Sequence, residues 1–259
     1  MKDLILRHND CLFKFTFLPW DSDYFGVVSY LFDWRNSKIG SHFQGLGEFL
    51  AKGLPPDSFI TAKIPSTEES TFLNLLIKCG FDYIDTGVIL EMESCHLAAS
   101  KKRASICEVK KMGSGTTRGI PYNELGSTFS FTRFHQDAHI PKNKARGVWI
   151  NLFKNFVPKG DNAIFLAKHK DRIIGALLLK KSKLYLRRYL EICFLSVLPD
   201  FQEKGAGAAL IEAAVRTAAR KRAGLLVGTQ FRNLGALNFY IKKGFRIKET
   251  FVVLHRWQS

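Results

Sequence analysis

The sequence predicts an α/β protein. Hydrophobic residues make up 46% of its 259 positions and aromatic residues 13%, which is enough for a packed core. Apolar runs of strand length alternate with segments of helical spacing. The run from Leu190 to Val197 is nearly all apolar, which is typical of a central strand buried on both faces, and a helical pattern follows it.

The order of elements is clearest in the second half of the chain. A helix-rich part comes first and is interrupted at Pro141. Two apolar runs joined by Lys170-Asp171 then predict a β-hairpin. The expected elements are helices within 122–156, strands at 163–167, 173–179 and 190–197, a helix at 205–222, a strand at 225–229, a helix at 234–243 and a strand region at 246–257.

The composition along the chain predicts two domains. Residues 1–93 contain apolar alternation and helical segments, and they end in the strand-like run 86–92. The stretch 94–119 is polar and basic, which predicts a linker. We therefore expect an N-terminal α/β domain at 1–93 and a C-terminal domain at 120–259.

The two regions share a short sequence match. The segment from Leu73 to Phe81 aligns with the segment from Leu237 to Phe245. A helix, a glycine cap and a following strand would produce this match by local physics alone. Duplication of half a domain would produce it as well, and the N-terminal domain would then be a degenerate partial copy. Because Leu76 stands where the second copy has Tyr240, the first copy has lost any chemistry of the second.

The chain is strongly basic. Its 39 Lys and Arg residues against 23 Asp and Glu give a formal charge of +16, which attracts anionic partners such as nucleic acid, phosphate-bearing metabolites or membranes. The basic residues are spread along the chain in short clusters such as 101–103 and 220–222. A solvated surface is the favoured explanation of these clusters.

Cysteine usage and the N-terminus predict a cytoplasmic protein. The five cysteines are odd in number and widely separated, with no C-x-x-C pair, which fits inert thiols in a reducing compartment. No apolar run approaches the roughly 18 to 20 residues of a membrane helix. Residues 1–20 lack the apolar region of a signal peptide. We therefore expect no membrane partner.

A glycine-containing turn between the strand at 190–197 and the following helix predicts an anion site. Gly205 and Gly207 allow the backbone to approach a ligand closely, and Lys204 adds a mobile positive charge. The unpaired amides at the helix start point in the same direction as the positive end of the helix dipole. Simple entry into a helix would use the same glycines, so the turn alone is a weak signal.

A second motif makes the interpretation specific. Gln202-x-x-Gly205-x-Gly207 together with Asn233-x-x-Ala236-x-x-Phe239-Tyr240-x-Lys242-x-Gly244-Phe245 resembles the two signature segments of the GCN5-related N-acetyltransferases, the GNAT superfamily. The resemblance covers roughly 163–257. It implies the GNAT fold, which has a mixed, mostly antiparallel sheet flanked by helices, and it implies acetyl-CoA as co-substrate.

The resemblance also assigns roles to residues. Backbone groups of the strand end bind the pantetheine arm and polarise the thioester carbonyl, while the turn binds the pyrophosphate. Tyr240 takes the place of the general acid that protonates the leaving thiolate, or it only packs and hydrogen-bonds. The implied cofactor-binding residues are Leu195, Ser196, Val197, Gln202, Lys204, Gly205, Ala206, Gly207, Ala208 and Asn233, the last of which would also serve as a helix N-cap.

The general base is harder to assign. Glu191 lies on a strand that resembles the one carrying the base in histone-type members of the superfamily. A carboxylate at the edge of a buried strand would have a raised pKa. Glu191 would alternatively pair with Arg187 or Arg188, and the amine would then lose its proton through water.

Two further segments resemble the dTDP-fucosamine acetyltransferase family. They are Thr132 to Pro141, which follows the pattern (S/T)-R-F-x-x-D-x-x-I-P, and Pro19 to Gly26, which is similar to W-D-S-x-F-F-G. Ala138 and Tyr24 depart from the family's usual Pro and Phe. The resemblance implies a nucleotide-linked amino sugar as substrate and a role in cell-surface polysaccharide synthesis.

The Thr132 to Pro141 segment supplies the candidate substrate-binding residues Arg133, Asp137 and His139. Arg133 suits bidentate phosphate recognition, or it pairs with Asp137 one helical turn away. His135 and His139 stand four apart, but no third ligand is evident, so we expect no metal.

The sequence thus predicts acetyl transfer from acetyl-CoA to a nucleotide-linked amino sugar by direct attack in a ternary complex. Acetylation of a protein or peptide amine is the alternative enzyme function, favoured by Glu191. A non-catalytic module that binds acyl-CoA or nucleic acid is the alternative outside enzymes, but Tyr240 and Asn233 argue against an inert site. The chain lacks a recognised nucleic-acid reader motif, so we expect no nucleic-acid partner. A homodimer is compatible with the sequence.

Overall fold

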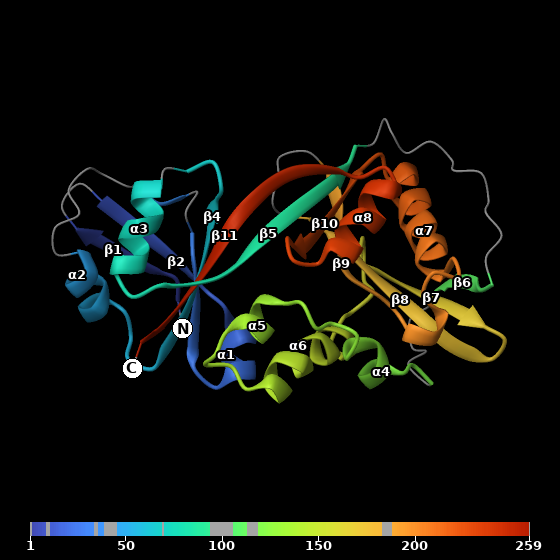
Figure 1. Ribbon diagram of the computed structural model, residues 1–259, viewed down its shortest axis with the longest axis horizontal. Coiled ribbons are helices and arrows are strands. Elements are labelled where there is room, and N and C mark those ends of the chain that lie inside the picture. Colours follow the sequence, from blue (N-terminus) through green and yellow to red (C-terminus); the bar gives the residue numbers. More distant parts are fainter. Residues whose placement is uncertain are drawn as a thin grey trace. The chain divides into compact units, whose positions relative to one another are not determined.

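The computed structural model divides the chain into two compact units (Figure 1). Unit 1 consists of 1–87, 136–139 and 249–259, and unit 2 consists of 88–135 and 140–248. The structure describes residues 2–8, 11–33, 36–38, 46–68, 70–93, 106–112, 119–182 and 188–258.

Unit 1 is a sheet with helices, and its strands follow the order β1-β2-β3-β4-β11. β3 and β4 are parallel, whereas the other pairs in this order are antiparallel. Its core is built largely from phenylalanine and aliphatic side chains such as Phe13, Phe15, Leu50 and Leu76. The elements are β1 (Leu4–His8), β2 (Cys11–Phe17), α1 (Pro19–Phe25), β3 (Val28–Phe32), α2 (Leu46–Gly53), β4 (Ser58–Pro65), α3 (Ser70–Lys78), the start of β5 (Asp82–Met92) and most of β11 (Arg246–Gln258).

The strands of unit 2 follow the order β6-β7-β8-β9-β10-β5. β9 and β10 are parallel, while β6, β7, β8 and β9 pair in antiparallel fashion. The elements are β6 (Glu108–Lys111), α4 (Tyr122–Gly126), α5 (Arg133–Gln136), α6 (Lys142–Lys154), β7 (Ala163–His169), β8 (Arg172–Lys181), β9 (Tyr189–Val197), α7 (Ala206–Arg220), β10 (Gly224–Gln230) and α8 (Leu234–Lys242).

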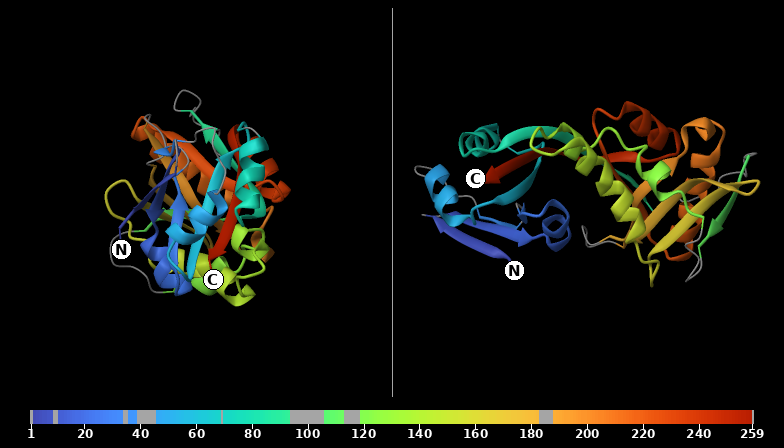
Figure 2. Two further views of the ribbon diagram at one scale, coloured as in Figure 1. Left: turned by 90° about the vertical axis from the view of Figure 1, so that its left-hand side faces the viewer. Right: turned by 90° about the horizontal axis from the view of Figure 1, so that it is seen from below.

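Helices cover both faces of the unit 2 sheet (Figure 1, Figure 2). Alternate side chains of β8 point to opposite faces, as the two-residue period of a strand requires. Leu177 and Leu179 belong to the core on which α7 packs through Leu210 and Ala214. Ala176, Leu178 and Phe194 belong to a second core with Leu125 of α4 and Phe153 of α6. The predicted helices and strands of the second half, and the α/β class, are confirmed.

The sequence match corresponds to a structural repeat. α3 and α8 end in the same way, with a glycine in the left-handed region followed by a buried phenylalanine, and a long strand begins at the next residue. The amide of this phenylalanine donates to the carbonyl five residues earlier, at 3.1 Å in both copies. The corresponding residues are Leu76, Gly80 and Phe81 in unit 1 and Tyr240, Gly244 and Phe245 in unit 2.

The strands that follow these two helices are exchanged between the units. Residues 88–92 of β5 belong to unit 2, where β5 is the neighbour of β10. Residues 249–258 of β11 belong to unit 1, where β11 pairs with β4 from Phe251↔Pro65 to Gln258↔Ser58. The unit boundaries therefore differ from the expected domains 1–93 and 120–259, because each half completes its sheet with a strand from the other half.

The expected linker 94–119 contains a strand. Residues Glu108–Lys111 form β6, which pairs with β7 at the edge of the unit 2 sheet. Residues 94–105 and 113–118 of that range, Cys95 among them, lie outside the described residues. The four described cysteines carry free thiols. They are Cys11, Cys79, Cys107 and Cys193.

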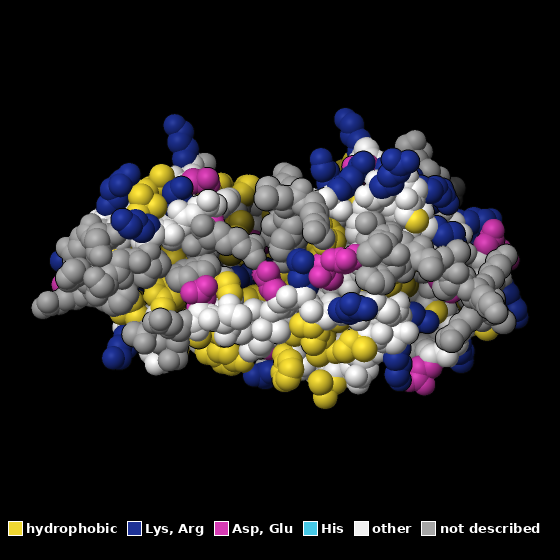
Figure 3. Space-filling model, turned by 90° about the horizontal axis from the view of Figure 1, so that it is seen from above, with side chains coloured by type: hydrophobic (Ala, Val, Ile, Leu, Met, Phe, Trp, Pro, Cys, Tyr) yellow, Lys and Arg dark blue, Asp and Glu magenta, His cyan; other side chains and the backbone are white. Residues whose placement is uncertain are grey.

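On the face drawn in Figure 3, the described Lys and Arg side chains stand in several separate groups. Among the described residues, no helix has the length and hydropathy that crossing a membrane requires.

Candidate active site

The parallel strands β9 and β10 pair along only part of their length. Their register runs from Tyr189↔Gly224 to Ile192↔Val227 and ends there, although both strands continue. On its other edge, β9 has a bulge at the same point, because Leu178 pairs with Phe194 while Leu179 pairs with Ile192. Cys193 is the extra residue. A bulge bends a strand and increases its twist, so it turns the remainder of β9 away from β10.

Unit 1 also has a pair of parallel strands, β3 and β4, and these two do not separate. β3 pairs with β4 along its whole length, from Val28↔Ser58 to Phe32↔Ala62. Because all five residues of β3 are paired, the described part of unit 1 has no opening like the one between β9 and β10. Among the described residues, an opening of this kind is found between β9 and β10, where a ligand can lie between parallel strands.

A cavity of about 290 Å³ lies where β9 and β10 separate. Its wall is formed by the free part of β9, the end of β10, α8, Trp149 of α6 and the segment that follows α4. Among the described residues that line it, there is no Asp, Glu, Lys, Arg or His. The lining residues are Thr128, Phe129, Ser130, Phe131, Trp149, Ile192, Cys193, Phe194, Leu195, Ser196, Val197, Gln202, Val227, Gly228, Thr229, Gln230, Asn233, Ala236 and Tyr240.

The turn after β9 leads directly into α7. Gly205 has a φ of 88°, in the left-handed region that favours glycine, and it precedes the first residue of α7. The Gln202 side chain holds the turn, because its Nε2 donates to the Val197 carbonyl oxygen at 3.0 Å. Lys204 Nζ donates to the Asp200 carbonyl oxygen at 2.8 Å. The predicted anion-binding turn therefore has its two polar side chains tied to its own backbone.

The start of α7 offers unused amides. The first intrahelical bond runs from the Ala209 amide to the Gly205 carbonyl oxygen, at 3.0 Å, so the amides of 206–208 precede it. No described side chain caps this helix end. A Cβ on Gly207 would make ordinary van der Waals contact with the Phe239 ring of α8, at 3.4 Å, so packing between the helices does not itself require glycine here. The geometry fits an anionic ligand.

α8 supplies two of the predicted residues. Asn233 is its N-cap, with Oδ1 accepting from the Ala236 amide at 3.2 Å. Tyr240 is 6% exposed and lies in edge contact with Phe239 and Phe245. Burial raises the pKa of the Tyr240 phenol above its ordinary value of 10. Within the described chain its hydroxyl has no hydrogen-bond partner, so the proton is available to a ligand in the cavity.

The free part of β9 presents its backbone to the cavity. Leu195, Ser196 and Val197 all line it. The Ser196 side chain is occupied elsewhere, because its Oγ donates to the Leu125 carbonyl oxygen at 2.9 Å and also lies 2.9 Å from Thr128 Oγ1. Ser196 therefore meets a ligand through its main chain.

Cys193 is a half-buried thiol in the cavity wall. Burial raises its pKa to about 12, although Lys180 acts in the opposite direction. Since the thiolate is the nucleophilic form, this cysteine is a poor acceptor for an acyl group at neutral pH.

The structure does not bring Glu191 into the cavity. Its carboxylate pairs with Lys180 across the β8–β9 ladder, with Nζ and Oε1 3.5 Å apart. The alternative pairing of Glu191 with Arg188 is not observed, because the Arg188 guanidinium lies 3.7 Å from the Asp161 carboxylate. Arg187 lies outside the described residues.

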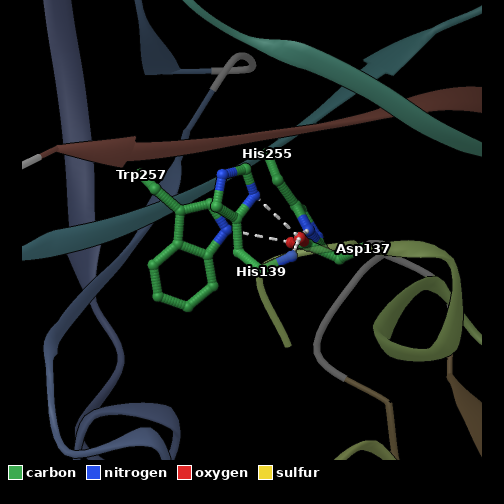
Figure 4. Close-up of polar contacts among 4 residues, drawn as sticks. All are labelled: Asp137, His139, His255 and Trp257. Atoms are coloured by element: carbon green, nitrogen blue, oxygen red, sulfur yellow. Dashed lines mark hydrogen bonds and ion pairs between the residues drawn. The ribbon is translucent and has the colours of Figure 1, made fainter. Parts of the chain in front are cut away.

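Asp137 holds strand β11 in unit 1 (Figure 4). Its Oδ2 accepts from Trp257 Nε1 at 3.0 Å and lies 2.6 Å from His255 Nδ1. Its Oδ1 accepts from the His139 amide at 2.8 Å. Trp257 in turn stacks on Phe59 of β4. The carboxylate joins the 136–139 segment to the last strand of the chain.

This geometry corrects the expectation that Asp137 binds substrate. Its side chain is 1% exposed, and its acceptor positions are taken by groups of unit 1. Burial by itself would raise the pKa of Asp137, but the hydrogen bonds from His255, Trp257 and the His139 amide outweigh it and lower the pKa to about 2. The residue is ionised and structural.

The other residues of that segment have separate surroundings. The Arg133 guanidinium lies over the Phe134 ring, 4.1 Å from its centroid, and not in the expected pair with Asp137. His135 Nδ1 lies 2.7 Å from Thr132 Oγ1, and burial lowers the pKa of His135, assisted by Arg146. His139 is exposed. The described residues contain no group of three or more His, Cys, Asp and Glu that could hold a metal ion.

Sequence reasoning missed the aromatic wall of the cavity. Phe129, Phe131 and Trp149 line it, and the Phe129 and Trp149 rings are stacked with centroids 4.4 Å apart. The Trp149 indole N–H is buried and lacks a hydrogen-bond partner in the described chain. Phe129 and Phe131 lie outside regular elements, so no periodic pattern marked them.

Comparisons with known proteins show the family to which this chain belongs. The sequence model of the Acetyltransferase (GNAT) family matches residues 128–245. An uncharacterized N-acetyltransferase of Mycobacterium tuberculosis is 33% identical over 115 residues, which are 42% of this chain and 72% of the relative. A protein of the same description from Mycobacterium bovis matches to the same extent. The chain belongs to the GNAT acetyltransferase family. It is an acyl-CoA-dependent N-acetyltransferase, and acetyl-CoA is its co-substrate.

Solved structures resemble nearly the whole length of this chain in their fold. A protein of unknown function from Staphylococcus epidermidis superposes with a TM-score of 0.66 and covers 99% of this chain and 95% of its own, at 13% identity. A GCN5-related N-acetyltransferase from Kribbella flavida gives 0.61, with 98% and 90% covered, at 13% identity. A tandem GNAT protein of the clavulanic acid pathway gives 0.60, with 98% and 82% covered, at 12% identity. At these identities the likeness establishes the fold.

We predict that Asp137→Asn destabilises the protein by about 3–5 kcal/mol at pH 7, since it leaves buried groups around His255 without their charged partner. Urea unfolding measures the change. Asp171→Asn is the matched control, because that carboxylate is fully exposed, and it should change the unfolding free energy by less than about 0.5 kcal/mol.

The lowered pKa of Asp137 also predicts how the free energy of unfolding depends on pH in acid. Because the folded pKa of Asp137 lies below the unfolded value of 3.8, its contribution is present above that pH and is lost as the pH falls toward about 2. The native protein should lose roughly 2–3 kcal/mol in this window that the Asn variant does not lose. Equal acid dependence of the two proteins would contradict the assignment.

Proposed function

We propose that this GNAT protein transfers an acetyl group from acetyl-CoA to a small-molecule amine by direct attack in a ternary complex. One observation carries the proposal: the cavity lies between the separated strands β9 and β10, with Tyr240 in its wall and the uncapped start of α7 after β9. This arrangement provides a place for an anionic, extended co-substrate and a proton donor at the same opening.

The residues present fit acetyl-CoA. The unused amides of 206–208 and the backbone of the Gln202 to Gly205 turn suit a pyrophosphate, because they are donors at the positive end of a helix dipole. The main chain of 195–197 is free on the side of β10 and suits the amides of the pantetheine arm. Acetyl-CoA supplies the activated acetyl group and the thiol leaving group.

The backbone of β9 and Tyr240 then act on the reacting atoms. An N–H of the free β9 edge stabilises negative charge on the carbonyl oxygen as the amine attacks, and such preorganised donors typically contribute the largest electrostatic effect. The Tyr240 hydroxyl protonates the departing sulfur. Because burial raises its pKa, the phenol keeps this proton throughout the neutral range.

Direct attack is favoured over a covalent enzyme intermediate. Cys193 is the cysteine that lines the cavity, and its raised pKa keeps it in the thiol form. Glu191, the candidate base, pairs with Lys180 and does not line the cavity. We therefore propose that the amine loses its proton to water and not to a carboxylate. The peptide-acetylating alternative loses its main support, which was Glu191.

For the acceptor we propose a nucleotide-linked amino sugar. The resemblance of Thr132 to Pro141 and of Pro19 to Gly26 to the dTDP-fucosamine acetyltransferases supports it. The formal charge of +16 supports it too, since such a sugar and acetyl-CoA are both polyanions. Arg133 and the exposed His139 remain candidates for its recognition, whereas Asp137 has a structural role.

Release of free thiol tests the proposal directly. The protein is incubated with acetyl-CoA and a panel of nucleotide amino sugars, lysine peptides and polyamines, and thiol is followed over time. We expect release that depends on an amino sugar. Failure of acetyl-CoA to raise the melting temperature would refute cofactor binding, and selective release with peptides would refute the acceptor.

Tyr240→Phe should lower kcat by about 10²–10⁴-fold, the usual contribution of a general acid, because the sulfur then departs unprotonated. The dissociation constant of acetyl-CoA should change less than twofold. Tyr189→Phe is the matched control: Tyr189 is similarly buried in unit 2 but donates to Glu91 and does not line the cavity. Equal kcat for Tyr240→Phe and the native protein would remove the acid role.

Two substitutions at Asn233 separate capping from cofactor binding. Asp is as good an N-cap as Asn, whereas Ala loses about 1 kcal/mol. We expect Asn233→Asp to keep the melting temperature and to weaken acetyl-CoA binding through repulsion of its anionic groups. Asn233→Ala should lower both the melting temperature and the affinity for acetyl-CoA. Native affinity in the Asp variant would restrict Asn233 to capping, and isothermal titration calorimetry provides the comparison.

A further inference from the structure

The segment Thr128 to Thr132 forms one wall of the cavity and is fixed at both ends. At its start, Thr128 Oγ1 donates to the Leu125 carbonyl oxygen at 2.9 Å and lies 2.9 Å from Ser196 Oγ. At its end, the Thr132 carbonyl oxygen accepts from the His135 amide at 2.9 Å. These bonds connect the segment to α4, β9 and α5, so its aromatic side chains have defined positions.

The segment carries one buried and one exposed ring. Phe129 stacks on Trp149 with an interplanar angle of 11° and also contacts Phe194, with centroids 4.9 Å apart. Phe131 lines the same cavity but is 53% exposed. Its ring is therefore open both to solvent and to the cavity. The pairing of Phe129 with Trp149 leaves Phe131 as the ring that an incoming molecule meets.

The lack of charged side chains among the described lining residues restricts the protonation state in which an amine can enter the cavity. Because none of its described lining residues carries a carboxylate, an ammonium group inside it would lack a counter-charge. Burying an unpaired ion is so costly that the group loses its proton instead. A lysine-type amine, with a pKa of about 10.4, is neutral in only about one molecule in a thousand or fewer at neutral pH. The cavity thus favours amines of low basicity.

We infer that the acceptor binds with the apolar face of a ring against Phe131 and that its amine enters the cavity uncharged. This inference rests on the proposed acetyl transfer and specifies the acceptor that the site selects. The unpaired indole N–H of Trp149 gives the same wall an unused donor, which suits a ring that carries oxygen. Phe131 is a specificity residue, whereas acetyl-CoA is bound by the turn and α7.

Three commercial amines serve as probes: glucosamine, a ring amine of low basicity; cyclohexylamine, a ring amine of high basicity; and putrescine, which has no ring. At pH 7.5 we expect kcat/KM to fall in that order. In pH profiles, kcat/KM should level off near the pKa of each free amine, which a titration of the amine provides, so that the midpoint moves with the acceptor. A midpoint common to glucosamine and cyclohexylamine would overturn uncharged entry.

Phe131→Ala should raise the KM for glucosamine about five- to tenfold, because one aromatic contact is removed, with the acetyl-CoA affinity unchanged. Phe131→Tyr keeps the ring and should restore the native KM. Phe231→Ala is the matched control, since Phe231 is 58% exposed but does not line the cavity. An unchanged KM in Phe131→Ala would overturn the role of Phe131.

These measurements distinguish a wrong acceptor from a wrong function. If acetyl-CoA raises the melting temperature and putrescine is acetylated while both ring amines are not, the acetyl transfer stands and the ring acceptor is wrong. If acetyl-CoA does not bind, the proposed function itself fails.

Discussion

The active site depends on the point at which β9 and β10 stop pairing. Up to Ile192 and Val227 the two strands form an ordinary parallel ladder inside the core, and beyond it the bulge at Cys193 turns β9 away. Unpaired backbone groups next to a core are costly, so an opening of this kind persists where a ligand completes the hydrogen bonds. The cavity, the turn into α7 and the position of Tyr240 all follow from this separation.

The features that sequence reasoning found are local. The Gln202 to Gly207 turn and the helix from Asn233 to Phe245 need particular residues at fixed spacing, so the positive φ of Gly205 and the N-cap at Asn233 could be predicted from neighbours in the chain. The features that it missed are long-range. Nothing near Asp137 indicates that its partners are His255 and Trp257, more than a hundred residues away.

The strand exchange escaped prediction for a related reason. The run at 246–257 has a clear strand pattern, but a pattern does not identify the neighbouring strand. The aromatic wall was missed because Phe129 and Phe131 lie in a segment without helical or strand periodicity, where aromatic side chains carry no spacing signal. The partner of Glu191 was missed as well, because the sequence position of this carboxylate does not reveal that it pairs with Lys180 of the adjacent strand.

The exchange of β5 and β11 has a consequence for how the protein can be divided. The family match at 128–245 invites expression of the second half alone, but that fragment would lack β5, and β10 would become an open sheet edge. The first half alone would lose the partner of β4 in the same way. Exposed edges of this kind template aggregation. Each half therefore needs a strand from the other half to complete its part of the sheet, and we expect the two halves to be stable only within one chain.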